Sequence, residues 1–224
     1  MRLVKFLSLT GLSAGIALLA LPSNAAIISD LFPTGVDSSG TPLGDGVSDP
    51  NYYILETESS GVVMNENNIP ASWVSHSSNS NWIWEKATGK PTHVTRTFRT
   101  TFDLTGLDPN TASISGKWAV DNQGLDILVN GISTGQTTGP TIRGFEELTT
   151  FNINSGFVDG LNTLDFVAKD LRHTPGFLVD SISGNADAIP QSVPEGSSLL
   201  SLLVVGLFST ASLVMHQLEN HDIQ

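Results

Sequence analysis

Four tryptophans are the side chains best suited to bind a ligand in this chain of 224 residues. A flat indole ring stacks on the apolar face of a sugar ring, and a neighbouring carboxylate or amide can then bind the hydroxyl groups. Trp73, Trp82 and Trp84 are therefore candidate carbohydrate-binding residues. Trp82 and Trp84 share one face of a short strand with Ile83 opposite, so this pair is either core or an exposed platform. Trp118 falls on the inward face of a later strand and is expected in the core.

Asp121, Asn122 and Asp126 bracket a turn directly after the strand that carries Trp118. Oxygen ligands at close spacing can hold Ca²⁺, whereas Asp and Asn in turns more often bind their own backbone. The loop 37–49 is a second oxygen-rich segment, but it lacks the spacing and the closing Glu of a helix-loop-helix calcium site. We expect no cofactor, with structural calcium at either place as the alternative.

Catalytic constellations are not evident from the spacing of the ionisable residues. Glu146 and Glu147 are adjacent, so on a strand they point to opposite faces and cannot act as a pair on one glycosidic bond. His76, His93 and His173 lie far apart and show no metal-ligand spacing. The sequence also contains neither a Gly-x-Ser-x-Gly elbow nor a phosphate-binding loop. We predict a protein that is not an enzyme, with an unrecognised glycoside hydrolase as a minor alternative.

The elements that must position these residues are predicted to be strands. In the segment 92–104, Val94, Phe98, Phe102 and Leu104 alternate with polar residues, which is typical of a half-buried strand. The alternation returns at 112–120 and at 125–129, and the latter stops at Asn130-Gly131, the strongest short hairpin signal. Further short strands are predicted at 52–55, 61–64, 151–153, 163–168 and 177–182. No helical pattern persists within 26–190, so the sequence predicts an all-β fold, a β-sandwich of the jelly-roll type.

Composition restricts the classes of partner. The net charge is −12, and it becomes −14 without Arg2 and Lys5, so a general electrostatic attraction to nucleic acid is excluded. The chain contains no cysteine, which excludes disulfide-stapled folds, thiolate metal sites and cysteine nucleophiles.

Both ends of the chain have the composition of targeting segments. Residues 1–25 combine a basic start, an apolar run and small residues before Ala25, which predicts a signal peptide helix cleaved between Ala25 and Ala26. The segment 190–224 begins as a proline-containing linker and continues as the uncharged span 197–215. Because a membrane-crossing helix needs about 20 apolar residues, this span predicts a transmembrane helix. The predicted globular domain is therefore 26–189.

Val193, Pro194 and Glu195, directly before this span, resemble the sorting signal of PEP-CTERM proteins. In that family a Pro-Glu-Pro triplet is followed by a transmembrane helix and a short basic tail. The resemblance implies processing by an exosortase-type enzyme and delivery to the cell surface or to exopolysaccharide. Two departures are that Gly196 stands at the third position and that the tail 217–224 carries no Lys or Arg.

The body of the chain is similar to the β-sandwich region of PEP-CTERM proteins and to galactose-binding-like modules. The similarity rests on segments such as 101–106, 118–122, 128–131 and 160–164. It implies an exported, membrane-tethered or exosortase-sorted protein of the surface or extracellular matrix, associated with polysaccharide and without enzymatic activity. The alternative is a lectin-like module with a defined sugar site, which would need an exposed aromatic ring beside converging polar groups.

Overall fold

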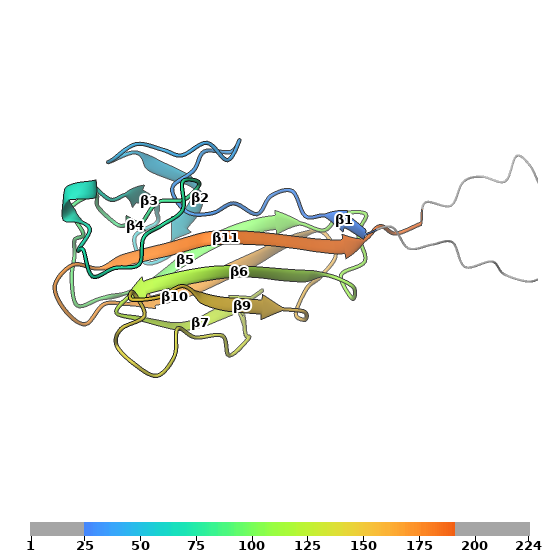
Figure 1. Cartoon of the computed structure of the whole chain (residues 1–224). Coiled ribbons are helices and arrows are strands. Elements are labelled where there is room, and N and C mark those ends of the chain that lie inside the picture. The colour runs from blue at the N-terminus through green and yellow to red at the C-terminus, as the bar shows by residue number, and fades with distance from the viewer. Residues whose placement is uncertain (1–24, 191–224) are drawn as a thin grey trace, which may run out of the picture. The chain divides into compact units, whose positions relative to one another are not determined.

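A computed structural model describes residues 25–190, which form eleven strands and one short 3₁₀ helix (Figure 1). The all-β prediction is confirmed for this part of the chain. The 3₁₀ helix spans Glu66–Asn68. The strands are β1 (Ala25–Ile27), β2 (Ser48–Ile54), β3 (Ser59–Val63), β4 (Ile83–Trp84), β5 (Thr95–Asp103), β6 (Ser113–Asp121), β7 (Gln123–Val129), β8 (Ile132–Ser133), β9 (Thr149–Ile153), β10 (Leu161–Lys169) and β11 (Gly176–Asp187).

The strands form two antiparallel layers. One layer has the order β8-β7-β10-β5-β2-β3 and the other has the order β4-β11-β6-β9, with β1 paired to β11. Figure 1 shows β11, β6 and β9 lying over β5, β10 and β7. The short strand β4 pairs with both β3 and β11 and so joins the layers along one side. From β5 to β7 and from β9 to β11 the chain alternates between layers, as in a jelly roll.

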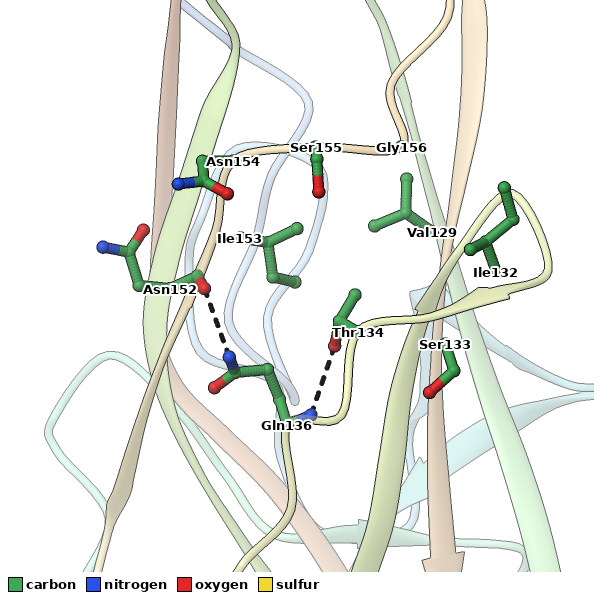
Figure 2. Close-up of a pocket in the computed structure, with 10 residues that line it drawn as sticks. All are labelled: Val129, Ile132, Ser133, Thr134, Gln136, Asn152, Ile153, Asn154, Ser155 and Gly156. Carbon is green, nitrogen blue, oxygen red and sulfur yellow. Dashed lines mark hydrogen bonds between the residues drawn. The ribbon is translucent and has the colours of Figure 1, made fainter.

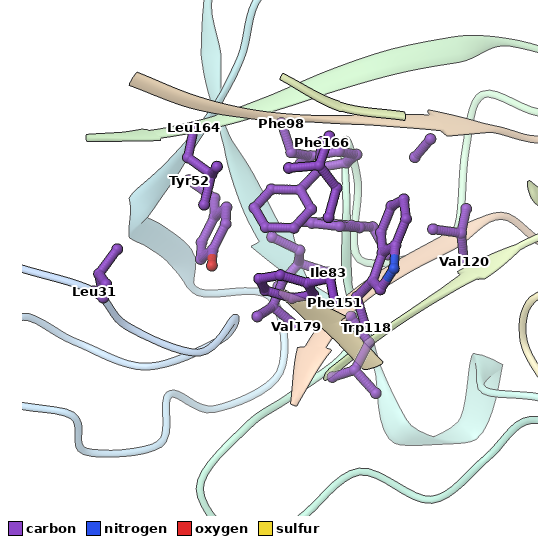
Figure 3. Close-up of a cluster of buried hydrophobic side chains, with 14 of the residues drawn as sticks. Leu31, Tyr52, Ile83, Phe98, Trp118, Val120, Phe151, Leu164, Phe166 and Val179 are labelled. Carbon is purple, nitrogen blue, oxygen red and sulfur yellow. The ribbon is translucent and has the colours of Figure 1, made fainter. Parts of the chain in front are cut away.

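Aromatic side chains fill the space between the layers (Figure 3). Phe98 of β5 stacks on Phe177 of β11 with ring centroids 4.4 Å apart. Trp118 of β6 lies 5.6 Å from Phe166 of β10, and Phe151 of β9 meets the same ring edge-on at 5.7 Å. Each such pair adds about 1 kcal/mol beyond the burial of its apolar surface. The prediction that Trp118 belongs to the core is confirmed, since it is fully buried.

The alternation in the sequence corresponds to the two faces of these strands. Phe98, Phe102 and Leu104 are buried, while Thr101 and Asp103 between them are exposed. The predicted hairpin at Asn130-Gly131 is also confirmed, because Val129 pairs with Ile132 across this two-residue loop. Both loop residues have positive φ, 52° and 79°, as a type I′ turn requires.

Several predicted features lie outside the described residues. These are residues 1–24 of the signal peptide, the motif Val193, Pro194 and Glu195, and the span 197–215. Within 25–190 there is no helix long and apolar enough to cross a membrane. Ala25 and Ala26, which flank the predicted cleavage bond, lie in β1, where they pair with Asp187 and Ala186 of β11.

Candidate functional site

Trp82 and Trp84 do not form an exposed platform. Both are fully buried, and so is Ile83 between them. The hypothesis that they bind carbohydrate is wrong, because β4 lies between β3 and β11 and its two faces are both covered. Their indole N–H groups donate to the backbone, from Trp82 to the Val74 carbonyl at 3.3 Å and from Trp84 to the Pro91 carbonyl at 3.1 Å.

Trp73 differs from the other two candidates because it lines a pocket. Its ring centroid lies 4.3 Å from that of Trp82 and 6.5 Å from that of Phe145. Only 6 % of its surface is exposed, so the ring presents little more than its rim to a ligand. Gly176, the first residue of β11, makes room for it, since an added Cβ would lie 2.3 Å from Trp73 Cη2.

This cavity, the Asp121 pocket, lies at the end of β6 and has a volume of about 540 Å³. Its lining comes from Asp121 and Asn122 at the end of the strand and from parts of three connecting segments, 70–73, 142–146 and 172–174. Pockets of about 300–1,000 Å³ that combine apolar walls with a few polar groups are typical of small-molecule sites.

Backbone hydrogen bonds fix the segment 142–146 against the end of β6. The Val120 N–H donates to the Gly144 carbonyl at 3.0 Å, and the Gly144 N–H donates to the Asn122 carbonyl at 2.9 Å. The Val74 N–H in turn donates to the Phe145 carbonyl at 2.7 Å. The rings of Trp73 and Phe145 are therefore held by connections that are tied both to the strand and to each other.

Asn122 holds the third segment in place. Its Oδ1 accepts hydrogen bonds from the backbone N–H groups of Leu171 at 2.6 Å and Arg172 at 3.1 Å. The Arg172 N–H also donates to the carboxylate of the buried Asp170. Asn122 is thus a positioning residue whose amide oxygen is already occupied.

The Asp121 carboxyl group is the most unusual group of the pocket. Its Oδ2 accepts a hydrogen bond from Trp73 Nε1 at 2.8 Å, whereas its buried Oδ1 has no partner among the described residues. Burial raises the pKa of Asp121 from 3.8 to about 7, the Trp73 hydrogen bond opposes this rise, and the nearby charge of Asp170 adds to it. A buried oxygen without a partner costs about 1–3 kcal/mol of stability.

Cationic side chains accompany this carboxyl group in the pocket lining. Arg143 forms an exposed ion pair with Glu146, and the exposed Arg172 is in no ion pair among the residues that the structure describes. The pocket lining therefore combines the Asp121 carboxyl group and the Glu146 carboxylate with two guanidinium groups and two aromatic rings. This set of groups suits a polar ligand with several hydroxyl groups and an apolar face.

The calcium alternative is not supported by the placement of its residues. Asp121 and Asn122 lie in the pocket, where Asn122 Oδ1 accepts from two backbone N–H groups and Asp121 Oδ2 accepts from Trp73. The Asp126 carboxylate instead accepts from the Ile127 and Gly135 N–H groups. Within 25–190, no group of three or more acidic, His or Cys side chains is placed to hold a metal ion. The three residues therefore do not converge on one ion.

The acidic groups of the loop 37–49 are likewise used by the protein itself. The Asp37 carboxylate accepts from the backbone of Ser39 and Thr41 in a turn. Asp49 is fully buried and accepts from the N–H groups of Gly35 and Asn51. Burial raises the pKa of Asp49 to about 6, and these hydrogen bonds oppose the rise. This loop is a structural support and not a cation site.

Sequence analysis missed Arg143, Phe145 and Arg172, because they come from two connections that carry no periodic pattern. One signal was available. The chain has only ten Lys and Arg residues against 22 Asp and Glu residues. Two arginines in otherwise irregular segments could have been examined as possible ligand-binding cations.

Comparison with known proteins identifies no family for this chain. No family model matches its sequence, and no curated protein matches it. Among solved structures, a family 35 carbohydrate-binding module (CBM35) from Paenibacillus barcinonensis aligns with 75 % of this chain and 99 % of its own, at 12 % identity and a TM-score of 0.34. A family 35 carbohydrate-binding module from an environmental isolate aligns with 58 % of this chain and 90 % of its own, at 16 % identity and a TM-score of 0.33. Similarity this low carries no argument about function.

Proposed function

We propose that this chain is an exported bacterial surface protein whose β-sandwich binds carbohydrate in the Asp121 pocket. The observation that carries the proposal is the Asp121 carboxyl group, which has one buried oxygen without a partner in the lining of an open pocket. Sugars present both hydroxyl groups and apolar ring faces, and the lining of this pocket combines the Asp121 carboxyl group with the rings of Trp73 and Phe145.

The binding test uses the full-length protein on a glycan array, followed by titration calorimetry with the best glycan. Arg172→Ala should weaken binding about tenfold, the usual effect of losing one strong polar contact in a site. Lys117→Ala is the matched control, since Lys117 is also exposed and points outward from β6, away from the pocket lining. Equal affinities of the Arg172→Ala variant and the parent protein would contradict the assignment of this pocket.

We propose that the domain binds its ligand without transforming it. One observation favours the alternative of a glycoside hydrolase, because Asp121, with its raised pKa, and Glu146 line the same pocket. A hydrolase needs one carboxylic acid and one carboxylate on either side of the scissile bond. Glu146 is instead engaged by Arg143 at the exposed rim. Incubation of the protein with its best glycan should release no reducing ends, and release that is lost in Glu146→Gln would establish the hydrolase.

The surface location rests on the two ends of the chain. We propose that a signal peptidase cleaves between Ala25 and Ala26, that the span 197–215 holds the chain in the membrane, and that an exosortase-type enzyme recognises Val193, Pro194 and Glu195. Replacing Pro194 and Glu195 with Ala should leave the C-terminal segment on the protein, while the parent protein loses it. Intact-mass measurement of protein recovered from the cell surface checks this, and a parent protein that still ends at Gln224 would make the segment a simple anchor.

A further inference from the structure

A second pocket lies between the edges of the two layers. The strands β8 and β9 are the outermost strands of their respective layers. Between them the segments 129–136 and 152–156 enclose a cavity of about 410 Å³, which we call the edge pocket (Figure 2). It shares no lining residue with the Asp121 pocket.

None of the ten residues that line the edge pocket is charged. Three of them are aliphatic, and the polar ones carry only hydroxyl or amide groups: Ser133, Thr134, Gln136, Asn152, Asn154 and Ser155. Without a carboxylate the pocket has no strong cation ligand, and without a guanidinium or ammonium group it has no strong anion ligand. The lining therefore favours an uncharged ligand.

Hydrogen bonds fix the two walls of the edge pocket before any ligand arrives. Gln136 Nε2 donates to the Asn152 carbonyl at 3.3 Å and so connects the two walls directly (Figure 2). Thr134 Oγ1 donates to the Ile127 carbonyl at 2.6 Å. Asn130 Nδ2 donates to the Gly156 carbonyl at 2.9 Å. A site whose walls are already ordered loses less conformational entropy on binding.

Several groups of the edge pocket remain free to bind a ligand. The side chains of Asn154 and Ser155 and the Oε1 atom of Gln136 form no hydrogen bond among residues 25–190. Figure 2 shows Ser155 and Ile153 pointing into the space between the walls, with Gln136 across from them. Ile132 stands at the wall with 63 % of its surface exposed. Hydroxyl and amide groups thus lie beside the exposed aliphatic side chain of Ile132, while Val129 and Ile153 are almost fully buried.

We propose that the edge pocket is a second binding site, which takes a neutral, hydroxylated ligand such as an uncharged stretch of a polysaccharide. The amide and hydroxyl groups bind the sugar hydroxyls, and the exposed side chain of Ile132 contacts the C–H face of the ring. The strand β7 runs from Gln123, beside the Asp121 pocket, to Val129 in the edge pocket. Since a strand rises about 3.3 Å per residue, the six intervals from Gln123 to Val129 place the two sites about 20 Å apart. One domain then holds two glycan segments, or two points on one chain.

The test titrates the full-length protein with three neutral probes, maltohexaose, cellohexaose and mannohexaose, at millimolar concentration. Ile132→Asp places a charge at the wall of the edge pocket and should weaken binding of a neutral probe about tenfold. Asn154→Ala removes a free amide and should weaken it in the same direction. The matched controls are Val47→Asp and Asn67→Ala, since both residues are exposed, lie outside either pocket, and Asn67 forms no side-chain hydrogen bond among the described residues.

The outcomes separate this proposal from the function of the Asp121 pocket. Weaker binding of a neutral probe by Ile132→Asp and Asn154→Ala, with unchanged binding by their controls and by Arg172→Ala, supports a second, independent site. Weaker binding by Arg172→Ala alone overturns the edge site and leaves the proposed function standing. Failure of all three neutral probes also overturns it. Binding of an extended peptide of alternating Thr and Val, lost in Ile132→Asp, would assign this edge to strand pairing with a protein and would overturn the glycan proposal.

Discussion

Raising the pH should destabilise the folded domain through Asp121. The folded state holds the Asp121 proton up to a pH of about 7, whereas the unfolded chain releases it near the ordinary pKa of 3.8. Unfolding therefore releases a proton between these values, and the free energy of unfolding falls as the pH rises through that window. The two pKa values of Asp121 differ by about three, which corresponds to a loss of about 4 kcal/mol in the free energy of unfolding if the site is dry. The loss is about half of that if water in the open pocket screens the charge.

The assay is urea denaturation of the full-length protein from below pH 3.8 to above the folded pKa of about 7. Asp49 contributes a loss of the same sign, but this loss ends at a lower pH because the raised pKa of Asp49 is about 6. The slope that remains about one pH unit above this value belongs mainly to Asp121. Asp121→Asn should remove it and should make the protein more stable than the parent at the alkaline end.

Asp159→Asn is the matched control, because Asp159 is exposed and forms no side-chain hydrogen bond among the described residues. It makes the same change in net charge and should leave the slope above the Asp49 transition unaltered. Identical slopes for the Asp121→Asn variant and the parent protein in this upper window would refute the reasoning. So would a variant that is less stable than the parent at the alkaline end.

Three further results are expected. Gly176→Ala should lower the free energy of unfolding by about 1–3 kcal/mol, because the new Cβ would overlap the Trp73 ring. Thermal melting followed by tryptophan fluorescence measures this loss, and an unchanged melting temperature would contradict this packing. Arg99→Met should lower the free energy of unfolding, measured by urea denaturation, by about 3 kcal/mol. The reason is that Arg99 makes two hydrogen bonds, at 2.6 and 2.7 Å, to the buried Asp165 carboxylate, which the variant leaves unpaired. The double variant Arg99→Met, Asp165→Leu is the control, and it should lose less stability because it removes that carboxylate as well. Calcium and EDTA should leave the melting temperature unchanged, and a rise with calcium would require a site that the described residues do not form.

The sequence predicted the strands that carry a period-two pattern. In β5 the side chains alternate between core and solvent, so Phe98 and Phe102 were placed on one face correctly. The alternation predicted at 125–129 is also present in β7, where Ile127 and Val129 are buried. The Asn130-Gly131 turn could be predicted because its two positive φ angles are an intrinsic preference of those residue types. Local chemistry is sufficient for features of this kind.

The burial of Trp82 and Trp84 and the Asp121 pocket could not be predicted in the same way. The short strand β4 is covered on both faces by packing that depends on the whole topology, so a period-two pattern does not describe it. In the pocket, Trp73, Phe145 and Arg172 lie on separate connections and meet only because backbone bonds attach those connections near the end of β6. Asp121 was selected from the sequence as a metal ligand, and only its burial and its unpartnered oxygen indicate a different role.

The pairing of β1 with β11 has a consequence for the export proposed above. Ala25 and Ala26 lie opposite Asp187 and Ala186, at the far end of the last strand. If the chain is secreted from its N-terminus as proposed, that partner strand would cross the membrane after every other part of the sandwich. The bond between Ala25 and Ala26 would then stay unpaired through nearly all of translocation, and it would become part of a sheet only when β11 pairs with β1. A signal peptidase would therefore have to cleave this bond before the fold is complete.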